Sequence, residues 1–394
     1  MGSFINPCFI YLDNNATTQV APEVFEAMRP FFLNQFGNPS SMHTCGGVVA
    51  KVVDVARESL ARLLGCDETE IVFTSGGTES DNFAIRGILE ANPDKRHIVT
   101  TRVEHPGVLN LARWLKRKGY EVTELDVDGD GILDLAAYRD ALREDTAIVS
   151  AMWANNETGV IFPVEEMAAI AKARGITFHT DAVQAVGKIP MDLSKLQVDL
   201  LSLSGHKLHG PKGIGALYVR RGTRIRPLMH GGHQERGRRP GTENVPGIVG
   251  LGKAADLAIE HMDDENTRVK ALRDRLEASL VGSIARTRVN GSTSNRLPNT
   301  TNVSFEFIEG EAILLRLNEL KIAASSGSAC TSGSLEPSHV LRAMGVPFTM
   351  VHGSVRFSFS RYNDADQVEY VSREFPKVVA DLRGISPYWS DSMG

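Results

Sequence analysis

Between about residues 70 and 220, short β-branched runs alternate with segments that have the apolar spacing of amphipathic helices. The predicted strands are Glu70–Ser75, His97–Thr101, Glu121–Val127, Ala147–Trp153, Ile176–Asp181, Asp199–Ser204 and Ile214–Arg220. Strand followed by helix, repeated several times, is typical of a mainly parallel sheet with helices on both faces. The sequence therefore predicts an α/β fold with a seven-stranded sheet sandwiched by helices. Because ligands of such sheets bind at the carboxyl ends of the strands, we look for chemistry there.

A long helical stretch follows this region. The spacing predicts one helix from Val245 to about Leu280, with no proline beyond its first turn. After it, strand and helix patterns restart on a smaller scale. We therefore expect a large domain over residues 15–260 and a second, smaller α+β domain formed by residues 1–14 together with residues 261–394.

Length and charge exclude several classes of partner. The chain has 394 residues, with 43 Lys and Arg against 48 Asp and Glu, and a formal net charge of −5. A mildly acidic chain has no general attraction to nucleic acid or to an anionic membrane surface. No apolar stretch approaches the ~18 residues of a membrane span, and the start lacks the basic and apolar regions of a signal peptide. We expect a cytoplasmic protein with no nucleic-acid or membrane partner.

The cysteines argue against a structural metal. They are Cys8, Cys45, Cys66 and Cys330, far apart and with no C-x-x-C pair. This spacing favours neither a zinc cluster nor a disulfide framework, and we expect Cys8, Cys45 and Cys66 to be small buried hydrophobic residues. The segment Asp126–Gly131 begins like a calcium loop, but Ala137 stands where that loop requires a Glu. We expect no permanent metal site.

The segment Thr74–Ser80 reads TSGGTES and follows the first predicted strand. Glycines such as Gly77 let backbone N–H groups approach an anion, and the N-terminus of the helix that starts here favours negative charge. The Thr78 hydroxyl adds another donor. A plain helix cap, which Ser and Thr make routinely, fits the same residues. The segment therefore indicates either a phosphate site or a helix cap.

Polar side chains follow four strands of the predicted sheet. They are His105, then Asn155, Asn156 and Glu157, then Asp181 and Gln184, and finally Ser204, His206 and Lys207. Since parallel strands end at one edge, we expect one site. A desolvated lysine can lose its proton for imine chemistry, and a carboxylate can hold a protonated ring nitrogen. With the phosphate site at Gly77, Lys207 and Asp181 predict pyridoxal phosphate as the cofactor.

The chain resembles the group I cysteine desulfurases, which are pyridoxal-phosphate enzymes of fold type I, along nearly its whole length. The resemblance rests on Tyr11–Thr18, Phe36–Ser41 and Val355–Ser358. Met152–Gly159, Gly231–Arg239 and Ser386–Ser390 resemble the NifS form of nitrogenase cluster assembly, whose catalytic motifs the housekeeping IscS form shares. The resemblance implies a homodimer that converts L-cysteine to L-alanine.

It also implies roles for single residues. The cofactor-binding residues would be Gly77, Thr78, His105, Asp181, Gln184, Ser204, His206, Lys207 and, from the neighbouring subunit, Thr242. Lys207 would bind the cofactor covalently, Asp181 would pair with the ring nitrogen, and Gln184 would donate to the ring hydroxyl oxygen. His105 would stack on the ring and move protons. Asn156 and Arg356 would hold the substrate carboxylate, a planar anion that suits a guanidinium group.

Cys330 lies in the segment SSGSACTSGS, residues 325–334, whose serines and glycines are typical of a mobile linker. The resemblance implies that the Cys330 thiolate takes up sulfur as a persulfide and supplies it to an iron–sulfur scaffold protein of the NifU type. The catalytic residues would then be Lys207, Cys330 and His105. Two alternatives remain: another reaction on the same fold, such as that of a selenocysteine lyase or an aminotransferase, and a non-catalytic partner of a scaffold.

Overall fold

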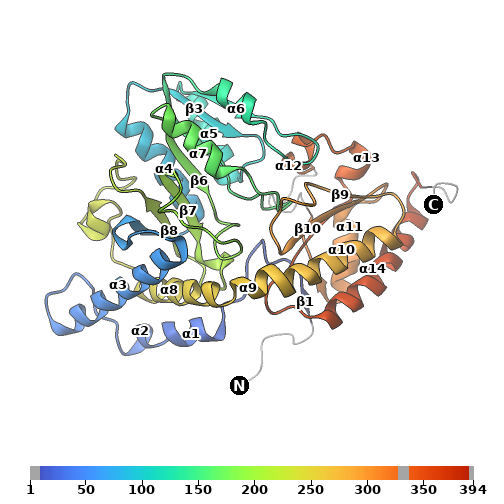
Figure 1. Ribbon diagram of the computed structural model, residues 1–394. Coiled ribbons are helices and arrows are strands. Elements are labelled where there is room, and N and C mark those ends of the chain that lie inside the picture. The colour runs from blue at the N-terminus through green and yellow to red at the C-terminus, as the bar shows by residue number, and fades with distance from the viewer. Residues whose placement is uncertain (1–8, 327–336, 390–394) are drawn as a thin grey trace.

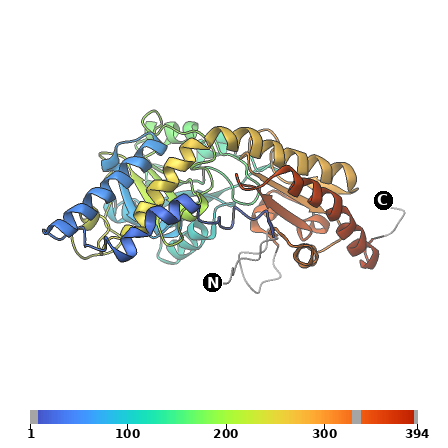
Figure 2. The same cartoon turned by 90° about the horizontal axis from the view of Figure 1, so that it is seen from below.

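The computed structural model describes residues 9–326 and 337–389 (Figure 1). Cys8, Cys330 and most of the predicted linker lie outside the described residues. A larger α/β body and a smaller body lie side by side in two perpendicular views (Figures 1 and 2). Helices α8 (Val245–Glu260) and α10 (Lys270–Ser283) belong to a helical run that passes from one body to the other.

The larger body is built on a seven-stranded sheet with the strand order β2-β8-β7-β6-β5-β3-β4. Its strands are β2 (Ile71–Thr74), β3 (His97–Thr101), β4 (Glu121–Leu125), β5 (Thr146–Ser150), β6 (Thr177–Asp181), β7 (Leu200–Ser204) and β8 (Gly215–Val219). Neighbouring strands are parallel, except that β8 runs antiparallel to both β2 and β7. Apart from the edge strand β4 and Thr177 of β6, every strand residue is buried, as a sheet covered on both faces requires. The predicted strands and fold class are confirmed.

Helices cover both faces of this sheet, and alternate strand residues face opposite helical layers. Val72 packs with α4 (Gly77–Ala91) and α5 (Pro106–Arg117). Its neighbours Ile71 and Phe73 pack on the other side, with α3 (Thr44–Leu64), α6 (Leu135–Ala141), α7 (Val164–Ala173) and α8. The sheet is thus the middle layer of three. The short helices α1 (Pro22–Met28) and α2 (Pro30–Leu33) lie beside α8.

The helical run between the bodies is not the single helix that the sequence predicts. Helix α8 ends at Glu260, and the next residue, His261, has a non-helical backbone with φ −100° and ψ 9°. The chain continues through the single turn α9 (Met262–Asp264) and the π-helical segment η4 (Glu265–Val269) into α10. The predicted uninterrupted helix is therefore wrong at His261. The apolar spacing continues across this point without a glycine or proline, so the sequence carries no local signal for the interruption.

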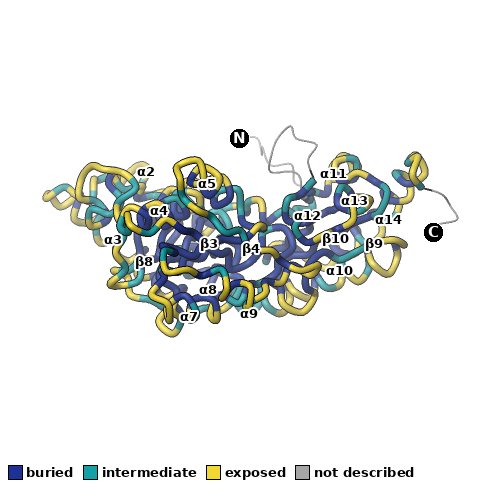
Figure 3. Tube along the Cα trace, turned by 90° about the horizontal axis from the view of Figure 1, so that it is seen from above, coloured by how far each residue is buried: buried dark blue, intermediate teal, exposed yellow. Residues whose placement is uncertain are grey.

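The smaller body has its own sheet and core. Strands β12 (Ser354–Ser358), β10 (Thr300–Phe305) and β9 (Thr287–Val289) form an antiparallel sheet, and β1 (Ile10–Tyr11) pairs in parallel with β11 (Ile322–Ala323). Helices α10, α11 (Gly310–Glu319) and α14 (Ala365–Ile385) pack their apolar residues against the three-stranded sheet. Figure 3 shows two buried interiors, one in each body. The exact division at residues 14 and 260 stays a prediction.

Two short helices connect the bodies more closely than the predicted division suggests. Helix α12 (His339–Ala343) contributes Val340 and Leu341 to the core of the larger body, and α13 (Phe348–Val351) contributes Val351. In the described part of the chain, no helix has the length and apolar character needed to cross a membrane. Over the same residues, no group of His, Cys, Asp and Glu side chains is arranged to hold a metal ion.

Cys45 is not the buried hydrophobic residue that the sequence predicts. It is an exposed free thiol in the first turn of α3, and this N-terminal end of the helix projects from the larger body, as Figure 1 shows. Cys66 follows α3 and is partly buried. Burial raises the pKa of the Cys66 thiol to about 12, so that Cys66 is a protonated thiol at neutral pH.

Candidate active site

A cavity of about 280 Å³ lies at the carboxyl ends of the central strands. It brings together most of the predicted site residues, namely Gly77, Thr78, His105, Asn156, Asp181, Gln184, Ser204, His206, Lys207 and Arg356. Asn155 and Glu157, which flank Asn156, do not line it, and neither does Thr242. Thr242 is exposed on the surface of its own chain, and Cys330 lies outside the described residues. The structure therefore gathers residues from both bodies at one place.

The start of α4 forms one end of the cavity. The residue before the helix, Gly76, provides no side-chain cap, so the alternative of a plain Ser or Thr cap does not apply here. The first backbone N–H groups of a helix have no partner within the helix. Gly77, Thr78 and Ser204 line the cavity at this end. The helix N-terminus and the hydroxyl groups of Thr78 and Ser204 therefore present donors to an anion in the cavity.

Lys207 lies directly beyond β7, in the single turn η2 (Gly205–Lys207). Its Nζ donates to the backbone oxygens of Asn15 and Ala16, at 2.7 Å for Ala16. The adjacent His206 contacts Thr17 Oγ1 through Nδ1 at 3.0 Å. Burial and the charge of Lys207 lower the pKa of His206 to about 4. The amine of Lys207 is thus placed in the cavity beside a neutral imidazole.

Asp181 and His105 line the same cavity, Asp181 from the end of β6 and His105 from the segment between β3 and α5. Asp181 ends β6, and its Oδ1 accepts from the backbone N–H of Val183 at 2.9 Å. Burial raises the pKa of Asp181, while the nearby His105 and Lys207 act against this rise. His105 caps α5: its Nδ1 accepts from the backbone N–H of Gly107 at 3.1 Å, and burial lowers its pKa. The proton of the neutral ring is therefore on Nε2.

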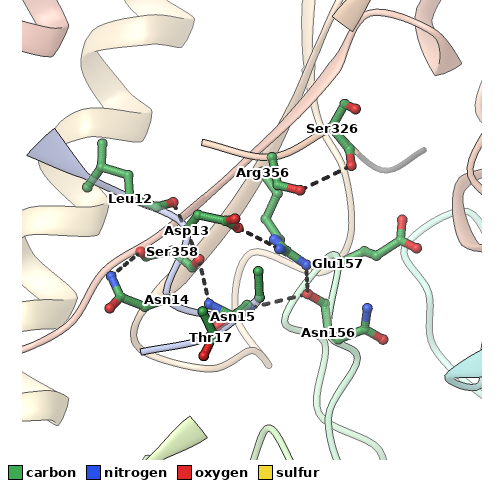
Figure 4. Close-up of polar contacts among 12 residues, drawn as sticks. Leu12, Asp13, Asn14, Asn15, Thr17, Asn156, Glu157, Ser326, Arg356 and Ser358 are labelled. Atoms are coloured by element: carbon green, nitrogen blue, oxygen red, sulfur yellow. Dashed lines mark hydrogen bonds and ion pairs between the residues drawn. The ribbon is translucent and has the colours of Figure 1, made fainter. Parts of the chain in front are cut away.

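Arg356 of β12 provides the guanidinium group of the site (Figure 4). Its Nη1 donates to the backbone oxygen of Asn156 at 2.8 Å, and its Nη2 pairs with Asp13 Oδ1 at 2.8 Å. The side chain is 5% exposed, and Nε has no hydrogen-bond partner among the described residues. Asn15 connects this region to Lys207, because its side chain also donates to the oxygen of Asn156, at 3.2 Å.

Comparison with known proteins shows which family has this chain's sequence and fold. Residues 10–371 match the model of the aminotransferase class-V family. The chain belongs to the aminotransferase class-V family. A protein of Gluconacetobacter diazotrophicus named cysteine desulfurase is 63% identical over 382 residues, which cover 96% of each chain. The cysteine desulfurase NifS of Azotobacter vinelandii is 59% identical, over 97% of this chain and 95% of that protein. A solved structure called a NifS-like protein is 40% identical, with a TM-score of 0.90 over 95% of this chain and 100% of its own. The predicted resemblance to cysteine desulfurases is confirmed.

The residues of this class-V site fit pyridoxal phosphate by their chemistry. The N-terminus of α4 at Gly77 and Thr78 suits a phosphate, and Lys207 presents an amine within the same cavity. Asp181 is a buried carboxyl group that a ring cation would keep ionised. Arg356 lines the same cavity and suits the carboxylate of a substrate amino acid. The cavity thus has groups for both the cofactor and the substrate.

Two buried acidic residues near this cavity, Asp81 and Glu104, were not selected by the sequence analysis. Asp81 of α4 lines the cavity, and its Oδ1 lies 3.7 Å from Nε2 of the buried His179. Burial lowers the pKa of His179 to about 3, so this imidazole is neutral. Burial raises the pKa of Glu104 to about 8 and raises that of Asp81 as well. Asp81 could have been found from its position one helical turn after Gly77, on the face that α4 turns to the sheet.

Proposed function

We propose that this protein is a cysteine desulfurase that uses pyridoxal phosphate. It converts L-cysteine to L-alanine and moves the sulfur atom to the thiol of Cys330, which becomes a persulfide. Atoms balance, since cysteine plus a thiol gives alanine plus a persulfide. The observation that carries the proposal is the convergence of Lys207, Asp181 and Arg356 on one cavity, in a chain with close relatives named cysteine desulfurases.

When bound, pyridoxal phosphate supplies an electron sink for the charge that develops at Cα of the substrate. Gly77, Thr78, Ser204 and His206 would hold its phosphate, and Thr242 would do so from the neighbouring subunit. Lys207 would hold the cofactor and then take the Cα proton, while the Asp181 carboxylate keeps the ring nitrogen protonated. Arg356 and Asn156 orient the substrate through its carboxylate. The Nε2–H of His105 is placed to donate a proton within the site.

Both flanks of the segment that carries Cys330 are held at this cavity. On one side, the backbone of Ser325 pairs with the backbone of Arg356, at 2.7 and 3.2 Å. On the other side, Ser338 donates to Glu157 Oε2 at 2.5 Å, and His339 Nε2 contacts the backbone oxygen of Glu104 at 2.9 Å. The few residues between Ser325 and Cys330 span at most ~18 Å when extended, at ~3.6 Å each. A thiol on this segment is therefore within reach of the substrate.

A homodimer is part of the proposal. Large apolar side chains of the first helices and their connections are exposed on this chain: Phe25, Phe32, Leu33, Phe36, Met42, Val48 and Val55. Exposed apolar surface of this extent, concentrated in α1 to α3, is typical of an interface. A second copy seated there is the occupant that would also let Thr242 serve a neighbouring site.

The cellular role follows from the relatives. We propose that the persulfide sulfur passes to an iron–sulfur scaffold of the NifU type for nitrogenase cluster assembly, in the cytoplasm. The support is the relative named NifS. We propose no nucleic-acid or membrane partner, because a net charge of −5 gives no general attraction to either.

The purified protein, loaded with pyridoxal phosphate, tests this function directly. L-Cysteine, L-selenocysteine and an amino acid with a 2-oxo acid are offered separately, and alanine, selenide and new amino acid are measured. We expect alanine from cysteine, and none from Lys207→Ala, in which no amine lies at that position. The exposed Lys195 provides a matched control, Lys195→Ala. Turnover of selenocysteine alone, amino transfer alone, or no reaction would each favour one of the alternative functions over this one.

A further inference from the structure

Lys188 is a buried lysine that the proposed reaction does not use. It lies after β6, on the segment that carries Asp181 and Gln184, and it is 6% exposed. Its Nζ donates to Gln184 Oε1 at 3.0 Å and approaches Asn15 Oδ1 at 3.4 Å. Burying an amine costs free energy unless it makes hydrogen bonds, and these two contacts offset that cost.

The contacts with Lys188 and with the backbone oxygen of Asn15 together fix which way the Gln184 amide faces. Side-chain amides can turn over, which exchanges an acceptor for a donor. The amine of Lys188 holds the oxygen of Gln184, while Gln184 Nε2 donates to the backbone oxygen of Asn15 at 3.0 Å. The second hydrogen of Nε2 is left for the cavity, which Gln184 lines. Without Lys188, only the backbone oxygen of Asn15 would hold the amide, so the orientation that turns its oxygen to the cavity would be less strongly disfavoured.

Lys188 also lies behind the proposed catalytic lysine. The backbone oxygen of Asn15 that accepts from Gln184 accepts from Lys207 as well. A small cavity of about 30 Å³ is lined by Lys188, Lys207 and Glu265. Burial lowers the pKa of Lys188 to about 7, and Glu265 acts against this lowering. Lys188 can donate to Gln184 in either protonation state, because the neutral amine also carries N–H groups.

We propose that Lys188 is a positioning residue of the active site, which holds Gln184 Oε1 so that the Gln184 N–H faces the ring hydroxyl oxygen of pyridoxal phosphate. The proposal rests on the proposed function, because it needs that cofactor in this cavity. A hydroxyl oxygen that carries negative charge is stabilised by an N–H donor and destabilised by a facing carbonyl oxygen. Lys188 itself need not touch the cofactor.

The test is a double-mutant cycle read out as the dissociation constant of pyridoxal phosphate from the protein. Lys188→Met keeps the length of the side chain and removes its donor. We expect about tenfold weaker binding, the effect of one hydrogen bond. In a Gln184→Ala background, Lys188→Met should cause no further weakening, because the group that it positions is gone. Lys188→Gln, which keeps an N–H donor, should bind more tightly than Lys188→Met.

Controls separate positioning from packing. Lys195→Met makes the same chemical change on the surface and should leave the dissociation constant unchanged. If Lys188→Met alone does not fold, the double variant Lys188→Met with Glu265→Gln replaces it. This variant also removes the carboxylate of Glu265, which would otherwise be left buried without the nearby charge of Lys188. Equal weakening by Lys188→Met with and without Gln184, or no weakening, would overturn the role of Lys188 alone. A wild-type protein that binds no pyridoxal phosphate would instead overturn the proposed function.

Discussion

At the scale of single residues, the structure sets protonation states by burial and by single hydrogen bonds. The backbone N–H of Gly107 places the proton of His105 on Nε2. Single hydrogen bonds also fix the orientation of Arg356. Asp13 and the backbone of Asn156 hold two of its nitrogens, and Nε has no partner among the described residues. Such contacts orient a side chain before any substrate arrives.

Replacing Arg356 by lysine should weaken substrate binding. A lysine cannot hold Asp13, Asn156 and a carboxylate in the planar geometry of a guanidinium. Losing a charged hydrogen bond costs ~1.5–3 kcal/mol, or roughly 10- to 100-fold, and we expect it as a higher KM for L-cysteine with a smaller change in kcat. Steady-state kinetics checks this, with the exposed Arg316→Lys as the control. An unchanged KM would remove Arg356 from the substrate site.

Glu104 should make the cofactor-free protein less stable as the pH rises. Its pKa is about 8 in the folded protein because of burial, against an ordinary 4.5. Between these values the folded protein keeps a proton that the unfolded chain has lost, so the free energy of unfolding falls with rising pH. Urea unfolding from pH 5 to 8 should show a steeper fall for the wild type than for Glu104→Gln. Parallel curves would show that Glu104 ionises normally.

At the scale of elements, the site depends on how α4 meets the segment after β6. A Cβ atom on Gly77, the first residue of α4, would lie 2.7 Å from Val183 Cγ2. Val183 in turn donates its backbone N–H to Asp181. One glycine therefore lets the proposed phosphate end and ring end of the cavity approach each other.

Gly77→Ala should weaken pyridoxal-phosphate binding by pushing Val183 and Asp181 away from α4. We expect a loss of about tenfold or more in affinity, measured by titration of the cofactor-free protein. Gly282→Ala is the matched control, because a Cβ there meets nothing within 4 Å and Gly282 lies in α10. That substitution should stabilise the protein slightly, by about 0.5–1 kcal/mol of helix propensity. Equal affinity in both variants would contradict the close approach at Gly77.

Local patterns predicted the strands of the central sheet and the residues at their ends. Strands buried on both faces are continuous apolar runs, which short windows of sequence reveal. The pattern failed where distant contacts decide the structure, as at His261 between α8 and α9. It also did not select Lys188, whose partner Asn15 is far away in the chain. Glu104 was missed because its burial depends on the assembled layers, whereas the position of Asp81 one helical turn after Gly77 was a signal that the analysis did not use.

At the scale of the whole molecule, the site combines two bodies and, by our proposal, two chains. Arg356 comes from the smaller body, while Lys207 and Asp181 come from the larger one. The helical run from α8 to α10 and the short helices α12 and α13 hold these bodies together. Substrate binding and cofactor binding therefore depend on parts of the chain that lie far apart in sequence.

Charged residues in the exposed apolar surface of α2 and its following segment should separate the dimer. Phe32 is 60% exposed and Phe36 is 78% exposed, and each would gain about 1.5–3 kcal/mol from full burial. We expect the wild type to sediment as a dimer and Phe32→Glu with Phe36→Glu as a monomer that retains less cofactor. Leu315→Glu, at a residue 70% exposed on α11, should remain dimeric. A monomeric wild type would disprove the dimer.

The central claim is that Cys330 takes the sulfur after the cofactor site has bound L-cysteine. The most direct measurement is mass spectrometry of the protein after L-cysteine is added without reductant, together with alanine release. We expect one extra sulfur atom on the Cys330 peptide, removed by added thiol, and almost no alanine from Cys330→Ala although its cofactor is retained. Cys45→Ala, which removes the exposed thiol, should behave as the wild type. Wild-type alanine release from Cys330→Ala, or the extra sulfur on Cys45, would contradict the account.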